Sequence, residues 1–469
     1  MGRLVVVSNR LADPRKTAAG GLAVALGQAL EASGGLWFGW SGRVVEDGTP
    51  GEGEVNRQQA GAVQLVTLDL SREDHDSYYL NYSSGVLWPV FHYRLDLANF
   101  DANGIAGYRR VNQLFAHKLK ALLRPDDVIW VHDYHLIPLA AELRAMGCEQ
   151  RMGFFLHVPL PPPLILAALP EHEWLMRSLF AYDLVGLQSE ADLTHFQRYA
   201  IDELRAQSVG EHGWRAFGKT LRVQAFPIGI DVEEFLNVAN GREATDLFEQ
   251  LRKEYARRRL LVGVERLDYS KGLPQRFKAF RTLLQNYPDN QGSATLIQIA
   301  SPSRESVDAY AALRNELESL SGAINGEHGE LDWMPLRYIH RNVARKRLPG
   351  LYRAASVALV TPLRDGMNLV AKEFVAAQDP DDPGVLVLSR FAGAAEQLDE
   401  ALLVNPYDMV RTAETIQRAL HMPPAERQQR HQALLARIRT HDVHWWRESF
   451  LRALQDTQEP SPSHEPERR

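Results

Sequence analysis

The sequence has almost no cysteine and no long apolar run. Cys148 is the single cysteine among 469 residues, so no internal disulfide can form. A chain of this length in an oxidising compartment would often carry several cysteines, which favours a cytoplasmic location. The apolar start at Leu4 reaches polar Ser8 within a few residues, and no stretch approaches the roughly 20 apolar residues of a membrane helix. We therefore expect neither a secreted nor a membrane-embedded protein.

An excess of positive charge is also missing. The chain has 53 Lys and Arg against 59 Asp and Glu, which gives a formal net charge of −6. Nucleic acids and anionic membranes are bound by basic surfaces, so we expect neither as a partner. A local basic pocket for a small phosphorylated substrate is compatible with this balance.

Short apolar runs alternate with helical patterns along most of the chain. A first series occupies residues 4–7, 127–132, 152–158 and 183–187 and ends at the Pro- and Gly-containing segment 226–230. A second series occupies residues 260–264, 295–300, 336–340, 356–360 and 385–388. Runs that are apolar at nearly every position predict strands covered on both faces, and therefore parallel sheets.

Two such series predict an α/β fold of two Rossmann-like, doubly wound domains, because the chain is too long for one core. We place the first domain at residues 1–230 and the second at 231–440. A helix at 441–455 is expected to cross back to the first domain, and the Pro-, Ser- and charge-rich tail 456–469 to be disordered. Ligands of these sheets bind beyond the carboxyl ends of the strands, so we expect the site in a cleft where those ends face each other.

Glycines follow the first predicted strand. Arg10 comes at the end of that strand, and Gly20 and Gly21 precede a helical pattern. Glycines there let a ligand approach the amides of a helix N-terminus, and the guanidinium of Arg10 can bind a phosphate. A plain strand–turn–helix corner explains the same residues equally well.

Polar residues also follow two later strands of the first series. His132, Asp133 and His135 come after one strand, and His157 after the next. The spacing of His132 and His135 is compatible with a metal site, but no third ligand pattern accompanies it. A buried, hydrogen-bonded histidine is the simpler interpretation of His132. Asp133 and His157 are better suited to holding sugar hydroxyls.

The second series carries a pair of cations after a strand. Arg266 and Lys271 lie on a loop that enters a helix through a glycine turn. Two cations at this position can neutralise a diphosphate leaving group, whereas solvation at the surface is the alternative interpretation.

A tight turn from strand to helix at residues 360–373 is the strongest local signal. The amides of Asn368 and Leu369 would open the helix and face a phosphate. Asp365 at the turn can bind sugar hydroxyls. Glu373, one helical turn beyond Leu369, can accept hydrogen bonds from both ribose hydroxyls. Taken alone, an exposed helix glutamate is the simpler interpretation of this residue.

Together these motifs resemble those of bacterial trehalose-6-phosphate synthases from Leu4 to about Trp446. The resemblance is carried by Gly20-Gly21-Leu22, Phe38-Gly39-Trp40-Ser41-Gly42, Leu87-Trp88-Pro89, His132-Asp133-Tyr134-His135-Leu136, Glu265-Arg266-Leu267-Asp268-Tyr269-Ser270-Lys271-Gly272-Leu273 and Arg364-Asp365-Gly366-Met367-Asn368-Leu369. It implies a GT-B fold, a retaining mechanism and no metal or other cofactor. It also implies transfer of glucose from UDP-glucose to glucose 6-phosphate, giving α,α-trehalose 6-phosphate and UDP for osmotic and stress protection.

The resemblance further implies roles for individual residues. The catalytic residues would be Arg266, Lys271, Asp365 and His157. The donor-binding residues would be Gly20, Gly21, Arg266, Lys271, Val343, Asp365, Asn368, Leu369, Val370, Ala371, Lys372 and Glu373. The acceptor-binding residues would be Arg10, Trp40, Tyr79, Trp88, Asp133 and Arg304. Anomer selectivity would rest on Trp88 and Val158.

Two features depart from the family pattern. The segment 11–19 is slightly short, and Val343 stands where an aromatic residue can occur, so we expect weaker stacking on the base. ADP-glucose or GDP-glucose as donor, and a catalytically silent sugar-phosphate sensor, stay open as alternatives. A phosphorylase is disfavoured because the sequence shows no signature of a pyridoxal-phosphate lysine. The sequence does not decide whether the chain forms a homo-oligomer such as a dimer or tetramer.

Overall fold

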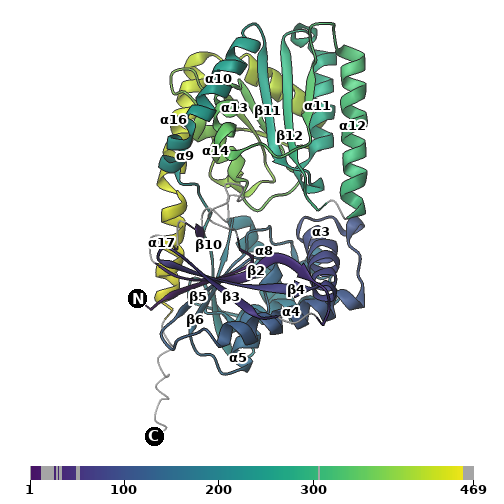
Figure 1. The fold of residues 1–469 in the computed structure, drawn as a ribbon. Coiled ribbons are helices and arrows are strands. Elements are labelled where there is room, and N and C mark those ends of the chain that lie inside the picture. The colour runs from purple at the N-terminus through teal and green to yellow at the C-terminus, as the bar shows by residue number, and fades with distance from the viewer. Residues whose placement is uncertain are drawn as a thin grey trace.

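The computed structural model describes residues 2–11, 26–27, 30, 34–48, 53–304 and 307–457. Within these residues the strands form two separate sheets, one of ten strands and one of six. The larger sheet lies in the lower half of Figure 1 and the smaller one in the upper half. Both sheets carry helices packed beside their strands, so the predicted pair of doubly wound α/β domains is confirmed.

The first sheet has the strand order β3-β4-β2-β1-β5-β6-β7-β10-β9-β8. Neighbouring strands run parallel from β4 to β10, and antiparallel strands extend both edges. Its strands are β1 (Leu4–Arg10), β2 (Gly35–Val45), β3 (Val55–Ala60), β4 (Val63–Ser71), β5 (Val128–His132), β6 (Arg151–Phe155), β7 (Leu184–Leu187), β8 (Gln207–Val209), β9 (Gly213–Ala216) and β10 (Lys219–Ala225).

Helices connect these strands. The described ones are α2 (Arg72–Asp74), η1 (His75–Leu87), α3 (Trp88–Phe91), η2 (Leu95–Leu97), α4 (Ala102–Lys120), η3 (Tyr134–Leu136), α5 (Leu139–Ala145), α6 (Pro163–Leu166), α7 (His172–Ser178), η4 (Leu179–Ala181) and α8 (Glu190–Asp202). The helix η1 is of the wider π type. Of the helix expected after β1, only Leu26, Gly27 and Leu30 are among the described residues, and all three are helical.

The second sheet has the order β13-β12-β11-β14-β15-β16, and all its strands are parallel. Its strands are β11 (Arg259–Arg266), β12 (Ala294–Ser301), β13 (Leu336–Ile339), β14 (Val357–Val360), β15 (Val385–Ser389) and β16 (Leu402–Val404). The remaining elements are α9 (Val232–Ala239), α10 (Arg242–Glu254), η5 (Tyr269–Lys271), α11 (Leu273–Asn286), η6 (Pro288–Asn290), α12 (Asp308–His328), η7 (Arg345–Arg347), α13 (Leu348–Ala354), α14 (Leu369–Ala377), η8 (Gly393–Glu396), α15 (Met409–Leu420), α16 (Pro424–Thr440) and α17 (Val443–Gln455).

Burial explains why the apolar runs became central strands. Every residue of β5, β7 and β14 is buried, as expected for parallel strands covered on both faces. By contrast, β3 is largely exposed and polar, as befits an edge strand. The strand predicted at 152–158 ends earlier, at Phe155, whose carbonyl accepts the amide of Asp133.

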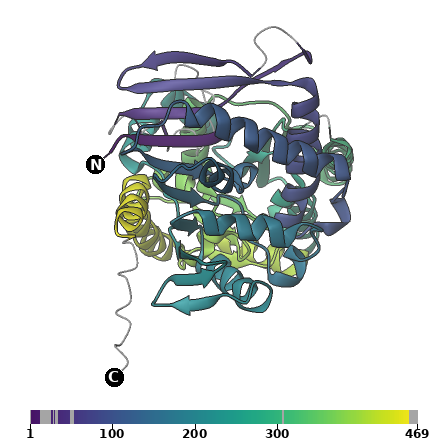
Figure 2. The same cartoon turned by 90° about the horizontal axis from the view of Figure 1, so that it is seen from below.

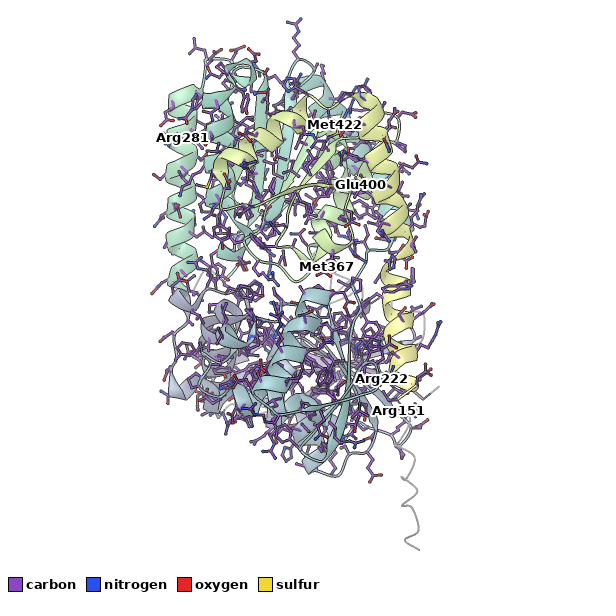
Figure 3. The ribbon with its side chains drawn as sticks, turned by 180° about the vertical axis from the view of Figure 1, so that it is seen from behind. Arg151, Arg222, Arg281, Met367, Glu400 and Met422 are labelled. Atoms are coloured by element: carbon purple, nitrogen blue, oxygen red, sulfur yellow. The ribbon has the colours of Figure 1, made fainter. Side chains whose placement is uncertain are left out.

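The chain passes from the first domain to the second through residues 226–231 and returns through α17. The carbonyl of Ile230 accepts the amide of Val443 at 3.2 Å, so the two crossing segments lie side by side. Figure 2 shows α17 beside the strands of the first domain. The C-terminal carbonyls of α17 are capped by the first domain: Arg151 donates to Gln455 at 2.5 Å and Arg222 to Ala453 at 3.4 Å (Figure 3).

Phe450 anchors α17 on the first sheet. Its ring stacks on Trp130 at a centroid distance of 4.8 Å. A Cβ atom on Gly153 or Gly186 would lie 2.8 Å from this ring, so these two glycines make the room that Phe450 fills. Of the tail predicted to be disordered, only Asp456 and Thr457 are among the described residues. No helix in the described ranges has the length and apolar character that crossing a membrane requires.

Candidate active site

Loops from the two sheets meet at the boundary between the domains. His157 follows β6 of the first sheet, and Gly366 follows β14 of the second. A Cβ atom on Gly366 would lie 2.2 Å from the carbonyl oxygen of His157, so only glycine permits this approach. Next to it, Arg364 lies 3.7 Å from the carboxylate of Asp192 across the boundary. The carboxyl ends of the two sheets therefore face each other here, as predicted.

Lys271 and Asp365 form an ion pair on the second domain. The ammonium of Lys271 donates to Oδ2 of Asp365 at 2.6 Å, and both side chains are largely buried. Gly272, with φ of 66°, makes the turn that leads from Lys271 into α11. Arg266 is exposed at the end of β11, and its guanidinium lies 5.6 Å from the ring centre of Trp88. Two cations against one carboxylate leave a net positive charge that suits a diphosphate.

The N-terminus of α14 belongs to the same cluster. Asn368 has φ of 85°; its Oδ1 accepts the amide of Ala371 at 3.3 Å, and its Nδ2 donates to Asp365 at 3.0 Å. The amides of Leu369 and Val370 precede the first hydrogen bond within the helix, and together with the helix dipole they favour an anion. Cations and helix amides thus converge beside Asp365.

Glu373 lies one turn further along α14. Its Oε2 accepts a hydrogen bond from the hydroxyl of Tyr352 at 3.4 Å. Burial raises the pKa of Glu373 to about 7, although the positive charge of Arg345 acts in the opposite direction. Val343, in the loop after β13, is partly buried and packs against the same apolar core as Leu369 and Val370. Glu373, expected at the ribose, is thus held on α14 by Tyr352, and Val343, expected at the base, packs on the apolar core that also supports the start of α14.

Arg304 reaches from the second domain to the first. Its guanidinium donates to the hydroxyls of Tyr310 and Tyr134, each at 3.0 Å, and lies 3.9 Å from the ring centre of Trp88. Tyr310 in turn donates to Asp268 at 3.1 Å. Burial alone would raise the pKa of Asp268, but Arg304 and then Arg266 and Lys271 outweigh it and hold that pKa below its usual range. The cation of Arg304 is thus fixed in place by groups of both domains.

Aromatic rings of the first domain form a continuous wall. Arg10 is exposed at the end of β1, with its guanidinium 5.7 Å from the ring centre of Trp40. The rings of Trp40 and Tyr79 lie 5.6 Å apart, and Tyr79 stacks on His135 at 6.1 Å. Flat apolar rings beside cations and a tyrosine hydroxyl suit a phosphorylated sugar.

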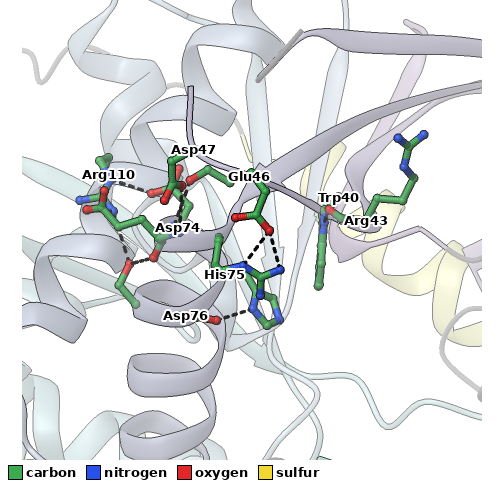
Figure 4. Close-up of polar contacts among 12 residues, drawn as sticks. Trp40, Arg43, Glu46, Asp47, Asp74, His75, Asp76 and Arg110 are labelled. Carbon is green, nitrogen blue, oxygen red and sulfur yellow. Dashed lines mark hydrogen bonds and ion pairs between the residues drawn. The ribbon is translucent and has the colours of Figure 1, made fainter. Parts of the chain in front are cut away.

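Polar contacts hold the helix that carries Tyr79. Arg72 donates to Glu46 at 2.9 Å, the amide of Glu73 donates to Asp47 at 3.1 Å, and Arg110 donates to Asp74 at 2.6 Å. Figure 4 shows these contacts joining α2, which leads directly into η1, to the residues just after β2 and to Arg110 of α4, with Trp40 alongside. The position of Tyr79 is therefore fixed relative to Trp40.

A hydrogen bond joins Asp133 to His157. Oδ1 of Asp133 accepts the amide of His157 at 3.2 Å, and burial raises the pKa of Asp133 to about 6. Nδ1 of His132 lies 3.0 Å from Nε2 of His157, which confirms the interpretation of His132 as a buried, hydrogen-bonded histidine. His135 stacks on Tyr79 instead, and within the described ranges no three His, Cys, Asp or Glu side chains gather as a metal site.

Some of the residues predicted for the site do not direct their side chains into it. The ammonium of Lys372 points away from the cluster and donates to the carbonyl of Ile228 at 2.7 Å and to Gln397 at 2.6 Å. Burial lowers the pKa of Lys372 to about 7. Ala371 is fully buried, and Val158 is buried against the turn at Gly366. Gly20 and Gly21 lie outside the described residues.

Sequence reasoning missed Tyr134, Tyr310 and Arg364. Tyr134 stands inside the polar segment after β5, and Arg364 directly precedes Asp365, so both positions carried a signal. Tyr310 lies on α12 in an ordinary amphipathic pattern, and nothing local distinguishes it.

Two domains built on parallel strands, whose strand ends meet around cations, helix amides and aromatic rings, define a glycosyltransferase with the GT-B fold. Comparisons with known proteins give the family. The profile of glycosyltransferase family 20 matches residues 6–456. Trehalose-6-phosphate synthase of Cronobacter sakazakii is 49% identical over 467 residues, which cover 99% of this chain and 98% of that protein. The chain belongs to glycosyltransferase family 20.

Solved structures agree with this assignment. An α,α-trehalose-phosphate synthase (UDP-forming) from Burkholderia xenovorans, in complex with glucose-6-phosphate, has 48% identity and a TM-score of 0.93, with 97% of this chain and 100% of that chain covered. An E. coli protein bound with UDP-2-fluoro glucose has 48% identity and a TM-score of 0.92, with 97% and 99% covered.

Proposed function

We propose that the protein transfers glucose from UDP-glucose to glucose 6-phosphate and releases α,α-trehalose 6-phosphate and UDP. One observation carries the proposal: Trp88 lies against Arg266 and Arg304, at the junction of the two halves of the site. The half around Lys271 and α14 suits a nucleotide diphosphate, and the half around Tyr79 suits a phosphorylated sugar. The UDP-forming synthase and the UDP-sugar complex among the relatives support the choice of substrates.

The proposed mechanism retains the configuration at the anomeric carbon. The bond from C1 of the donor glucose to the diphosphate oxygen breaks as the O1 hydroxyl of glucose 6-phosphate bonds to C1 on the same face. The hydroxyl proton passes to the departing phosphate oxygen. Arg266, Lys271 and the α14 amides stabilise the charge that develops on that phosphate. Asp365 is paired with Lys271, and Asp133 accepts the amide of His157, so neither carboxylate is assigned the role of nucleophile.

The proposal assigns no metal or other cofactor, because cations of the chain take the place beside the diphosphate. It includes a cytoplasmic location, which agrees with phosphorylated and nucleotide-activated substrates. We expect turnover to persist in excess chelator. A complete dependence on an added divalent cation would contradict this part of the proposal.

A nucleotide-release assay tests the substrates. UDP-, ADP- and GDP-glucose are each supplied with and without glucose 6-phosphate. We expect release that depends on glucose 6-phosphate and is fastest with UDP-glucose. Fastest release with ADP- or GDP-glucose would identify that compound as the donor in place of UDP-glucose. No release with any of the three donors would favour a sugar-phosphate sensor.

Variants connect this activity to the site. We expect Arg266→Ala to lower turnover by about a hundredfold or more, since it removes charge stabilisation from the leaving group. Arg257→Ala, at an exposed position before β11, is the matched control and should keep wild-type turnover. Wild-type turnover in Arg266→Ala would refute the assignment of the diphosphate site.

A further inference from the structure

His132 and His157 form a histidine pair that the strand register imposes. His132 ends β5 and is paired in the sheet with Phe155, the last residue of β6. His157 follows two residues later, and the rings meet with Nδ1 of His132 3.0 Å from Nε2 of His157. The contact of Asp133 with the amide of His157 fixes the backbone beside the pair, and Asp133 itself has φ of 75°. Both backbone and side chains therefore hold the two rings together.

Aromatic rings enclose His132. Its ring centre lies 4.5 Å from that of Trp130, 6.5 Å from Phe155 and 6.2 Å from Trp446 of α17. His132 is fully buried, and within the described part of the chain no polar group pairs with its Nε2. Burial, and then the neighbouring His157, lower the pKa of His132 well below its usual range, and burial lowers that of His157 to about 3. Both rings are therefore neutral at physiological pH.

A neutral imidazole carries one N–H, so the pair has two protons for four ring nitrogens. One proton lies in the hydrogen bond between the rings. If His157 donates it, the second proton is on Nε2 of His132, where an N–H is attracted to aromatic faces. If His132 donates it, a bare lone pair faces those rings instead. Donation by Nε2 of His157 leaves Nδ1 of His157 as an acceptor, whereas donation by Nδ1 of His132 leaves it as a donor. Only the first arrangement lets His157 accept a substrate hydroxyl.

We propose that His132 is a positioning residue that holds His157 in the tautomer with Nε2 protonated, so that Nδ1 accepts a hydroxyl of the donor sugar. This inference rests on the proposed function for the role of His157. His132 does not contact substrate in this arrangement. Its effect on catalysis passes through the hydrogen bond to His157.

A double-mutant cycle tests the proposal. His132→Phe keeps an aromatic ring but removes the hydrogen bond, whereas His132→Asn keeps a polar group near the position of Nδ1. We expect His132→Phe to lower kcat/KM for the donor by about tenfold, and His132→Asn to stay within about threefold of the wild type. In a His157→Phe background, His132→Phe should have no further effect on kcat/KM. Equal losses in Phe and Asn variants, or additive losses in the double variant, would overturn the proposal.

Two further measurements separate positioning from folding and from the proposed function. His172→Phe replaces a histidine of α7 that bonds to the hydroxyl of Tyr199 on α8, outside the residues assigned to the site, and controls for the stability cost of such a change. It should lower thermal stability without changing kcat/KM. Nitrogen NMR of histidine-labelled protein reports the tautomer of His157 without any turnover. We expect a protonated Nε2 in the wild type and mixed tautomers in His132→Phe; a protonated Nδ1 in the wild type would refute the inference even if the enzyme is active.

Discussion

Replacing Glu373 by Gln should stabilise the protein at high pH while weakening donor binding. Glu373 has its ordinary pKa of 4.5 in the unfolded chain and a pKa of about 7 in the folded one, chiefly because of burial. The folded state therefore holds the proton more tightly, and ionisation above pH 7 disfavours folding. That difference corresponds to about 3 kcal/mol above pH 7 and vanishes below pH 4.5. A glutamine of similar shape does not carry this cost.

The expected signature is a stability difference that grows with pH. A domain of this size loses or gains roughly 2 °C in Tm per kcal/mol, so Glu373→Gln should melt about 6 °C above the wild type at pH 8. At pH 4.5 the two proteins should melt together. Calorimetry without ligand between these pH values measures the difference, and Glu249→Gln on the exposed face of α10 is the matched control. A difference that is the same at every pH would refute the assignment of a buried, proton-binding carboxyl.

Two other predictions concern the acceptor and the returning helix. Arg304→Ala should raise KM for glucose 6-phosphate by about tenfold or more and KM for the donor far less, because the variant removes a cation fixed by Tyr134 and Tyr310. Steady-state kinetics with each substrate varied in turn measures both values. An equal rise in the two KM values would contradict the acceptor role. Phe450→Ala should destabilise the protein by about 3–5 kcal/mol because it empties the space between Gly153 and Gly186. Thermal denaturation measures this, with Arg452→Ala at an exposed position of the same helix as the control. Equal Tm values for the two variants would exclude an anchoring role for Phe450.

The fold was predictable where the chain is apolar at every position. The residues of β5, β7 and β14 are buried on both faces, so their sequence carries the signal for parallel strands without any alternation. The strand β3 and the π-type helix η1 were not predicted. The first has the exposed, polar sequence of an edge strand, and the second lacks the 3.6-residue periodicity by which a helix is recognised.

The candidate site divides in a similar way. Arg266 ends a strand, and Lys271, Asp365 and Asn368 lie in the turns that follow strands, so their meeting could be predicted from the topology of the sheets. The bond between Lys372 and the carbonyl of Ile228 could not, because it joins residues 144 positions apart through the orientation of one helix. The pairing of His132 with His157 depends on the register of β5 and β6, and a shift of one residue would separate the rings.

The return of the chain through α17 has a mechanical consequence. The chain crosses between the domains twice, and the two crossing segments run next to each other. The amide of Val443 donates a hydrogen bond to the carbonyl of Ile230, and the carboxylate of Asp231 lies 3.2 Å from the ring of His444. Two adjacent connections of this kind form a hinge between the domains. We expect them to restrain sliding and twisting of one domain over the other and to leave rotation about the line of the two connections as the main movement. We expect the donor half to swing onto the acceptor half along a single arc, always presenting the same face of the activated sugar to the incoming hydroxyl.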